Sequence, residues 1–241
     1  MIRLIREPRP AELTAELQKR LTEEYKKSGK AVWKQKWIKD ALLKSSFGKC
    51  AFSEVKLEEE GKYMEVEHFH PKSLYPDEVL EWNNLLPISN VCNRKKKNLD
   101  TKRRPLVNPM EDNPQDYFYI KDGRICTKNA NDSKAEDTIL YYDLNNNDQF
   151  REKRFAIENW ILRKLQDYAT QYAVDKNRYA SKLLVLMQSS GRTFDYSATK
   201  STIILTSSDY IKLKEQMKAD GKWTNDYIEA EAELEYCCLK P

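Results

Sequence analysis

The spacing of apolar residues predicts two helices at the start of the chain. Within residues 10–28 an apolar residue recurs at every fourth position among charged ones, which places one apolar stripe along a helix. Within residues 31–45 the apolar residues again fall on one helical face, and Gly48, just beyond, is typical of a helix end. The segment 1–46 is therefore expected to be helical.

The helical period is lost between residues 49 and 104. Two short strands are expected at 63–68 and 85–88, because these runs carry apolar and β-branched residues and a polar, proline-containing loop separates them. A short helix is expected from about residue 92 to 98. This order of elements predicts a small ββα unit.

The remaining chain is expected to be mainly helical. Turn residues at Lys121-Asp122-Gly123 predict a hairpin between 117–120 and 124–127. The helical period then returns from residue 148 to about 186, and two further helices are expected near 208–220 and 225–238. The aromatic stripe of residues 155–172 is interpreted as core or partner interface.

The predicted fold class is α+β, with a small ββα core embedded between helical segments. The expected organisation is a helical segment at 1–46, the core at 47–109, and a mainly helical region at 110–241. We expect that last region to pack on the core and to dock a partner.

Composition and charge exclude several classes of protein. The formal net charge is only +4, because 42 basic residues face 38 acidic ones, so the distribution of charge matters more than its sum. No run approaches about 18 consecutive apolar residues, and we expect no membrane span. Five cysteines do not form a disulfide framework, and the start of the chain does not read as a signal peptide, so a cytoplasmic protein is expected.

The candidate chemistry is concentrated around the two histidines of the chain, His68 and His70. Hydrolysis of a phosphodiester needs an activated water and a cation that stabilises the leaving oxygen. An imidazole suits the first task, which makes His68 the candidate base. Glu67 and Asn93 supply oxygen atoms suited to Mg²⁺ or Mn²⁺. A helix N-cap is the competing interpretation of Asn93.

Basic residues beside these groups are candidates for binding nucleic-acid phosphates. They are Lys72, Arg94, Lys95, Lys96 and Lys97, and His70 joins them as a further candidate. A solvated surface is the usual meaning of such a basic run, and a structural or exposed role is the alternative for His70.

The order of these residues resembles the HNH endonucleases, whose fold is called ββα-metal. The resemblance rests on Glu67-His68 with Pro71 three residues later, on Asn84-Leu85, and on Cys92-Asn93. It implies that His68 is the general base, that Glu67 replaces the usual Asp as a metal ligand, and that Asn93 completes the metal site. It also assigns a catalytic role to Asn84, which would brace the loop that orients His68.

Many members of that family carry two Cys-x-x-Cys pairs that bind a structural zinc. In this chain Cys50 and Ser53 stand for one pair, and Ser89 and Cys92 for the other. Two thiolates and two hydroxyls are a poor ligand set for zinc. We therefore expect a degenerate site and no structural zinc.

Further segments resemble one HNH subfamily: Arg3-Leu4-Ile5-Arg6, Lys49-Cys50-Ala51-Phe52, Trp82-Asn83-Asn84-Leu85 and Leu144-Asn145. That subfamily is the PtuB-like nuclease subunits of Septu-type anti-phage systems, which also occur beside some retrons. The resemblance spans most of the chain and implies a PtuA-like ATPase as partner and nucleic acid, with DNA favoured, as substrate. Two alternatives stay open. One is a catalytically degenerate HNH module that binds nucleic acid or acts as a scaffold, and the other is a nuclease that works alone.

Overall fold

The computed structural model describes residues 1–59 and 63–241 and has the α+β fold class that the sequence predicts. The chain divides into two compact units. We call them the mixed unit, made of Arg3–Asp112 and Asn131–Leu144, and the helical unit, made of the other described residues. The predicted division at residues 46 and 109 stays a prediction.

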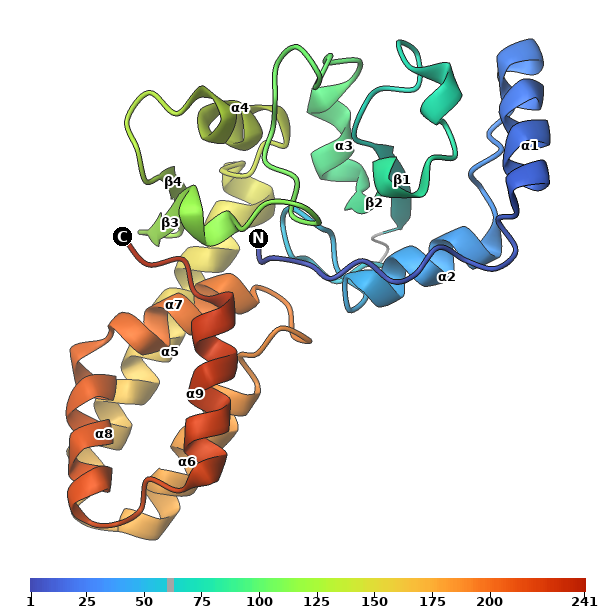
Figure 1. Cartoon of the computed structure of the whole chain (residues 1–241). Helices are drawn as coiled ribbons and strands as arrows, with labels where there is room; N and C mark the ends of the chain where they lie inside the picture. The colour runs from blue at the N-terminus through green and yellow to red at the C-terminus, as the bar shows by residue number, and fades with distance from the viewer. Residues whose placement is uncertain (60–62) are drawn as a thin grey trace. The chain divides into compact units, whose positions relative to one another are not determined.

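A two-stranded sheet followed by a helix forms the centre of the mixed unit (Figure 1). Strand β1 (Met64–His68) pairs antiparallel with β2 (Leu85–Ser89), and His68 lies opposite Leu85. Helix α3 (Asn90–Lys96) follows β2 without a break, because Ser89 is its N-cap and the side-chain oxygen accepts from the Cys92 amide. The predicted strand–strand–helix order of elements is thus present.

Three more helices belong to the mixed unit. Helices α1 (Ala15–Ser28) and α2 (Lys36–Ser45) correspond to the two predicted at the start of the chain, and Thr14 and Gly29 cap α1 at its two ends. Helix α4 (Ser133–Tyr141) was not expected from the sequence. Short 3₁₀ turns at Pro76–Glu78 and Trp82–Asn84 shape the loop between β1 and β2.

The β1–β2 sheet has two faces with different neighbours. On the face toward α2, Met64 and Val66 join an apolar core that includes Val32, Ile38 and Leu85. On the opposite face, α3 packs against both strands. Because side chains alternate along a strand, His68 belongs to the α2 face, whereas Glu65 and Glu67 belong to the α3 face.

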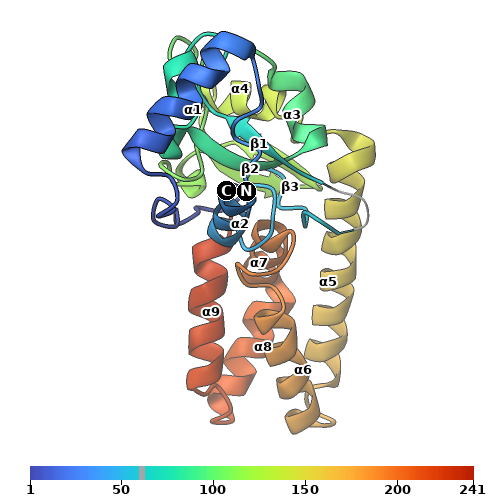
Figure 2. The same cartoon turned by 90° about the vertical axis from the view of Figure 1, so that its right-hand side faces the viewer.

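The helical unit begins with the hairpin that the sequence predicts, formed by β3 (Phe118–Lys121) and β4 (Arg124–Thr127). A 3₁₀ turn (Pro114–Asp116) precedes it and a π-helical turn (Asn147–Arg151) leads into the helices. The helices are α5 (Glu152–Gln171), α6 (Lys176–Gln188), α7 (Ser197–Thr206), α8 (Ser208–Ala219) and α9 (Asn225–Cys237). Helix α5 packs against α6, α7 and α8, and α9 packs against α6 and α7 (Figures 1 and 2).

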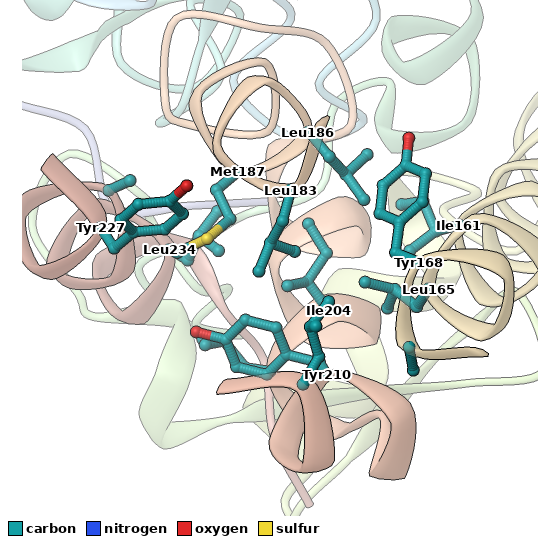
Figure 3. Packing of buried hydrophobic residues seen from close by; sticks show 14 of the residues in the cluster. Ile161, Leu165, Tyr168, Leu183, Leu186, Met187, Ile204, Tyr210, Tyr227 and Leu234 are labelled. Atoms are coloured by element: carbon teal, nitrogen blue, oxygen red, sulfur yellow. The ribbon is translucent and has the colours of Figure 1, made fainter. Parts of the chain in front are cut away.

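The core of the helical unit is apolar and aromatic. Leu165, Leu183 and Ile204 are fully buried there, and the ring of Tyr210 packs beside them (Figure 3). The helical period expected from 148 to about 186 corresponds to two helices, because the chain leaves α5 after Gln171 and Asp175 caps α6.

Two aromatic residues of the predicted stripe on α5 are not core. Phe155 and Trp160 are about half exposed, whereas Tyr168 and Tyr172 lie in the core as expected. In the part of the chain that the structure describes, no helix combines the length and apolar character needed to cross a membrane.

Candidate active site

His68 is the last residue of β1, and its ring is buried on the α2 face of the sheet. The imidazole Nε2 lies 3.0 Å from the carbonyl oxygen of Val79, and the ring meets Trp33 edge to face. A carbonyl only accepts, so Nε2 carries the proton and Nδ1 keeps a free lone pair. Among the described residues Nδ1 has no hydrogen-bond partner. The structure therefore leaves one nitrogen of His68 able to accept a proton.

The electrostatic surroundings keep His68 neutral. Burial, followed by the positive charge of Lys72, lowers the pKa of His68 to about 3. A buried imidazole loses the hydration that stabilises its cationic form, and a nearby ammonium repels a second positive charge. His68 is consequently unprotonated near pH 7, and the same surroundings disfavour its protonated form.

Glu67 is buried on the opposite face of the sheet. Its Oε1 lies 2.6 Å from the ammonium of Lys96, and the Tyr142 hydroxyl donates to the same oxygen at 3.4 Å. Burial raises the pKa of Glu67 above its usual value, although the Lys96 ammonium acts in the opposite direction. Lys96 also donates to the main-chain carbonyl of His68 at 2.8 Å. Lys96 therefore links the two residues even though their side chains point to different faces.

Asn93 contacts a different carboxylate from the one expected. Its Nδ2 donates to Glu65 Oε2 at 2.6 Å, which leaves the amide oxygen as an acceptor. Glu65 stands two residues before Glu67 and shares its face of β1. Three oxygen-bearing side chains thus lie on the α3 face, with Asn93 hydrogen-bonded to Glu65 and Glu67 paired with Lys96.

These oxygen donors are chemically suited to a divalent cation. Two carboxylates and an amide are the ligand types that Mg²⁺ and Mn²⁺ prefer. Within residues 1–59 and 63–241, no group of three or more His, Cys, Asp and Glu side chains could hold a metal ion. A cation here would depend on Glu65, Glu67 and Asn93, and it would compete with Lys96 for Glu67.

Asn84 braces the loop that follows His68. Its Oδ1 accepts from the His70 amide at 2.6 Å, and its Nδ2 donates to the carbonyls of His70 and Glu78 at 3.0 and 3.3 Å. All three partners are main-chain groups, so Asn84 contributes to the site by positioning. His70 itself turns to Glu78, whose Oε2 lies 2.7 Å from its Nδ1.

The predicted basic run is not one continuous charged surface. Arg94, Lys95 and Lys97 are exposed, but Lys96 is buried against Glu67. Lys95 pairs with Asp143 at 2.7 Å. The other predicted basic residue, Lys72, is half-buried with its ammonium 4.8 Å from the centre of the Trp33 ring.

The four residues of the degenerate zinc site come together in the interior. Burial alone would raise the pKa of Cys50, but hydrogen bonds with Cys92 and Ser53 outweigh it and lower the pKa to about 5. Burial and the contact with Cys50 raise the pKa of Cys92. The Ala51 amide donates to Pro87 of β2 at 2.9 Å, which ties this turn to the sheet. The expectation that no zinc binds here stays a prediction.

The sequence interpretation missed several groups of the site. Glu65 was signalled only by the Glu-x-Glu spacing at 65–67, which puts both acids on one face of a strand. Nothing local signalled Tyr142 or the Val79 carbonyl, because both reach the site from distant segments.

No protein-family model matches the chain. A protein named Septu protein PtuB from Bacillus thuringiensis is 35% identical over 238 residues, which cover 94% of this chain and 91% of that protein. A second Septu protein PtuB, from Bacillus mycoides (strain KBAB4), is 29% identical over 164 residues, or 56% of this chain and 55% of that protein.

Proposed function

Because the chain belongs to the Septu PtuB family, we propose that it is a metal-dependent endonuclease of the HNH type. Its substrate is the phosphodiester backbone of nucleic acid, with DNA favoured, and its role is anti-phage defence. One observation carries the proposal: the His68 ring is held by the Val79 carbonyl through Nε2 and keeps a free lone pair on Nδ1.

The chemistry assigned to this chain's residues begins with His68. Nδ1 accepts a proton from the water that attacks phosphorus, and the Val79 carbonyl holds the ring and stabilises the resulting imidazolium. Because Nδ1 is buried, water reaches it only when the side chains that cover it move. Asn84 fixes the loop after His68, and Lys96 holds the His68 main chain against Glu67.

A divalent cation fits the proposal. Glu65, Glu67 and Asn93 are the residues that would hold it, and Mg²⁺ or Mn²⁺ would supply positive charge to the leaving oxygen. The remaining positive charge near the phosphate comes from Lys72, which interacts with both Glu65 and Glu67.

A plasmid-nicking assay with Mg²⁺ or Mn²⁺ tests the proposal. We expect His68→Ala to lower the cleavage rate by about 10²–10⁴-fold, because the general base is lost. His68→Gln serves as a second variant, since its amide can still donate to Val79 without offering a basic nitrogen. Circular dichroism confirms that each variant is folded. Equal cleavage by wild type and both variants would remove His68 from the mechanism.

The same proposal includes a PtuA-like ATPase as the partner. The family name supports it, and the nicking assay is therefore run on the chain purified together with that ATPase. Failure of the two proteins to co-purify would favour a nuclease that acts alone.

A second candidate function is a degenerate module that binds nucleic acid without cleaving it. The contact that favours it is the 2.6 Å ion pair in which Lys96 occupies the Glu67 carboxylate, together with Ser53 and Ser89 at the former cysteine positions. Nucleic-acid binding that persists in EDTA, with no cleavage in any divalent cation, would support this candidate.

A further inference from the structure

A groove of about 620 Å³ opens in the mixed unit beside the candidate active site. Four lysines line it together with two residues of the site: Lys34, Lys36, Lys39, Lys72, Glu65 and Asn93. We call it the lysine groove. Of these six residues, Lys72, Asn93 and Glu65 belong to the ββα segment. The other three lysines come from α2 and the residues just before it.

The lysine groove follows the outer edge of β1. Met64 and Val66 of the α2 face line it, and so do Glu65 and Asn93 of the α3 face. Among the described residues β1 pairs with no strand other than β2, and the Met64 amide donates to the Glu58 carboxylate at 2.7 Å. His68 and Glu67 lie on opposite faces of β1, and the outer edge is where the two faces meet.

The charge of the groove favours a polyanion. Among the described residues that line it, there are four ammonium groups and one carboxylate, that of Glu65. Lys36 and Lys39 form ion pairs with Asp40 and Glu58 at 2.5 and 2.6 Å. Ion pairs as exposed as these contribute little to stability, so phosphates can replace their carboxylates. Lys34 is exposed and has no ion-pair partner in the described part of the chain.

Trp33, the one aromatic residue among the described residues that line the groove, already contacts other side chains. Lys72 covers the Trp33 ring at 4.8 Å, and His68 and Tyr25 meet the same ring edge to face. A nucleobase therefore has little of Trp33 to stack on, and recognition falls to the lysines. Lysines contact phosphates, which carry no sequence information.

We propose that the lysine groove binds the sugar-phosphate backbone of the nucleic acid, independently of sequence, and leads it to the edge of β1. Lys34, Lys36 and Lys39 hold the phosphates that flank the scissile one, and Lys72 receives the scissile phosphate between Glu65 and His68. This inference rests on the proposed function and assigns substrate binding to residues outside the ββα segment. Helix α2 begins in the groove at Lys36, so its positive dipole end adds to the attraction.

Binding is measured on the full chain in EDTA, so that cleavage does not contribute. The probe is a fluorescein-labelled 20-bp DNA duplex, with the single strand of the same sequence as a second arm, followed by anisotropy from 50 to 200 mM KCl. We compare Lys34→Ala/Lys36→Ala with Lys19→Ala/Lys27→Ala. The control removes the same charge from exposed lysines of α1 in the same unit.

We expect the groove variant to weaken binding to the preferred probe about ten-fold at 100 mM salt. Each lost phosphate contact lowers the slope of log affinity against log salt by about 0.9, so the slope should fall by about 2. The control should keep the wild-type affinity and slope.

Two outcomes would overturn the inference: equal weakening by both double variants, or unchanged binding by the groove variant. A failure of the proposed function looks different. If the groove inference is wrong, the groove variant binds like wild type but His68→Ala still cleaves poorly. If the proposed nuclease mechanism is wrong, His68→Ala cleaves like wild type but the groove variant still binds less tightly than the control.

Discussion

The degenerate zinc site keeps the arrangement of a metal site without its full set of ligand atoms. Its four residues are Cys50, Ser53, Ser89 and Cys92. The hydrogen bonds between them place the four residues of two distant segments together in the interior. The Ser53 hydroxyl is buried among them. Since the main chain already gathers four positions, only the ligand atoms at two of them are unsuited to zinc.

We predict that Ser53→Cys/Ser89→Cys creates a structural zinc site. Four thiolates around one Zn²⁺ form a standard structural set, and binding of the metal adds to the stability of the fold. The expected result is one zinc per chain by elemental analysis and a higher unfolding temperature that EDTA reverses. Ser53→Ala/Ser89→Ala is the matched control and should bind no stoichiometric zinc. A cysteine variant without zinc would mean that the four positions do not form a tetrahedron.

Lys96 and Glu65 mark the limit of what the sequence could say about individual side chains. Lys96 stands in a run of four basic residues, yet it is three positions after Asn93 and therefore shares the helix face that meets β1. Lys96 is buried because its ammonium forms an ion pair with the buried Glu67 carboxylate. The sequence singled out Glu67, His68 and Asn93 as candidates. The contacts of Glu67 and His68 depend on which face of β1 each occupies, and that of Asn93 depends on how α3 packs against β1.

Among the elements, the β3–β4 hairpin depends on one glycine. Gly123 has a φ of +68°, and Asp122 before it also has a positive φ, as expected for a tight two-residue turn. The turn lies against α5, because Arg154 Nε donates to the Gly123 carbonyl at 2.7 Å and Glu158 accepts from its amide at 3.0 Å. A Cβ at this position would lie 2.8 Å from the Arg151 carbonyl oxygen.

We predict that Gly123→Ala lowers the free energy of unfolding by about 2–4 kcal/mol, since backbone strain and a clash with main-chain atoms combine. Gly221→Ala is the matched control. Its φ is +66°, but nothing lies within 4 Å of an added Cβ, so it should cost only about 1–2 kcal/mol. Urea denaturation measures both. Equal losses would show that the close approach to α5 contributes nothing.

The elements that the sequence predicted well have a strong local signal. The hairpin has turn residues between alternating strands, and α1 has an apolar stripe with caps at both ends. Helix α7 has no such signal, because serine, threonine and isoleucine are buried on nearly every side of it. A helix surrounded by core shows no contrast between its faces. The break before α6 was missed for a related reason: apolar residues continue across it, and only the Asp175 cap marks the new start.

For the molecule as a whole, the net charge of +4 conceals how charge is distributed. Many lysines and arginines pair with nearby acids, Lys36 and Lys39 among them, yet four ammonium groups gather along the lysine groove. A local field of this kind attracts a polyanion more effectively than the same charge spread over the surface. The groove was not evident from the sequence, because the lysines beside Trp33 resembled the solvated face of a helix.

The dependence of stability on pH is also a property of the whole chain. It is simple to analyse here because the chain has few histidines. Only His68 and His70 are present, so few side chains have ordinary pKa values between 5 and 7. Burial and the charge of Lys72 lower the pKa of His68 from 6.5 to about 3 in the folded state. Between these values the unfolded chain binds a proton that the folded chain does not. The contribution of His68 to the free energy of unfolding is therefore fully present above pH 6.5 and is lost as the pH falls toward 3.

We predict that wild type loses about 2 kcal/mol more unfolding free energy than His68→Gln when the pH falls from 7 to 5. The size follows from the proton that His68 must take up on unfolding, at about 1.4 kcal/mol per pH unit once the pH is below 6.5. Urea denaturation in EDTA measures it, because a bound cation would change the charge near His68. Glu67, whose pKa is raised in the folded state, has the opposite effect on stability as the pH falls. Because wild type and His68→Gln both retain Glu67, much of that effect cancels when the two are compared. Parallel stability curves for the two proteins would show that His68 is accessible to solvent protons in the folded state, and its free Nδ1 would then be an exposed nitrogen rather than a protected base.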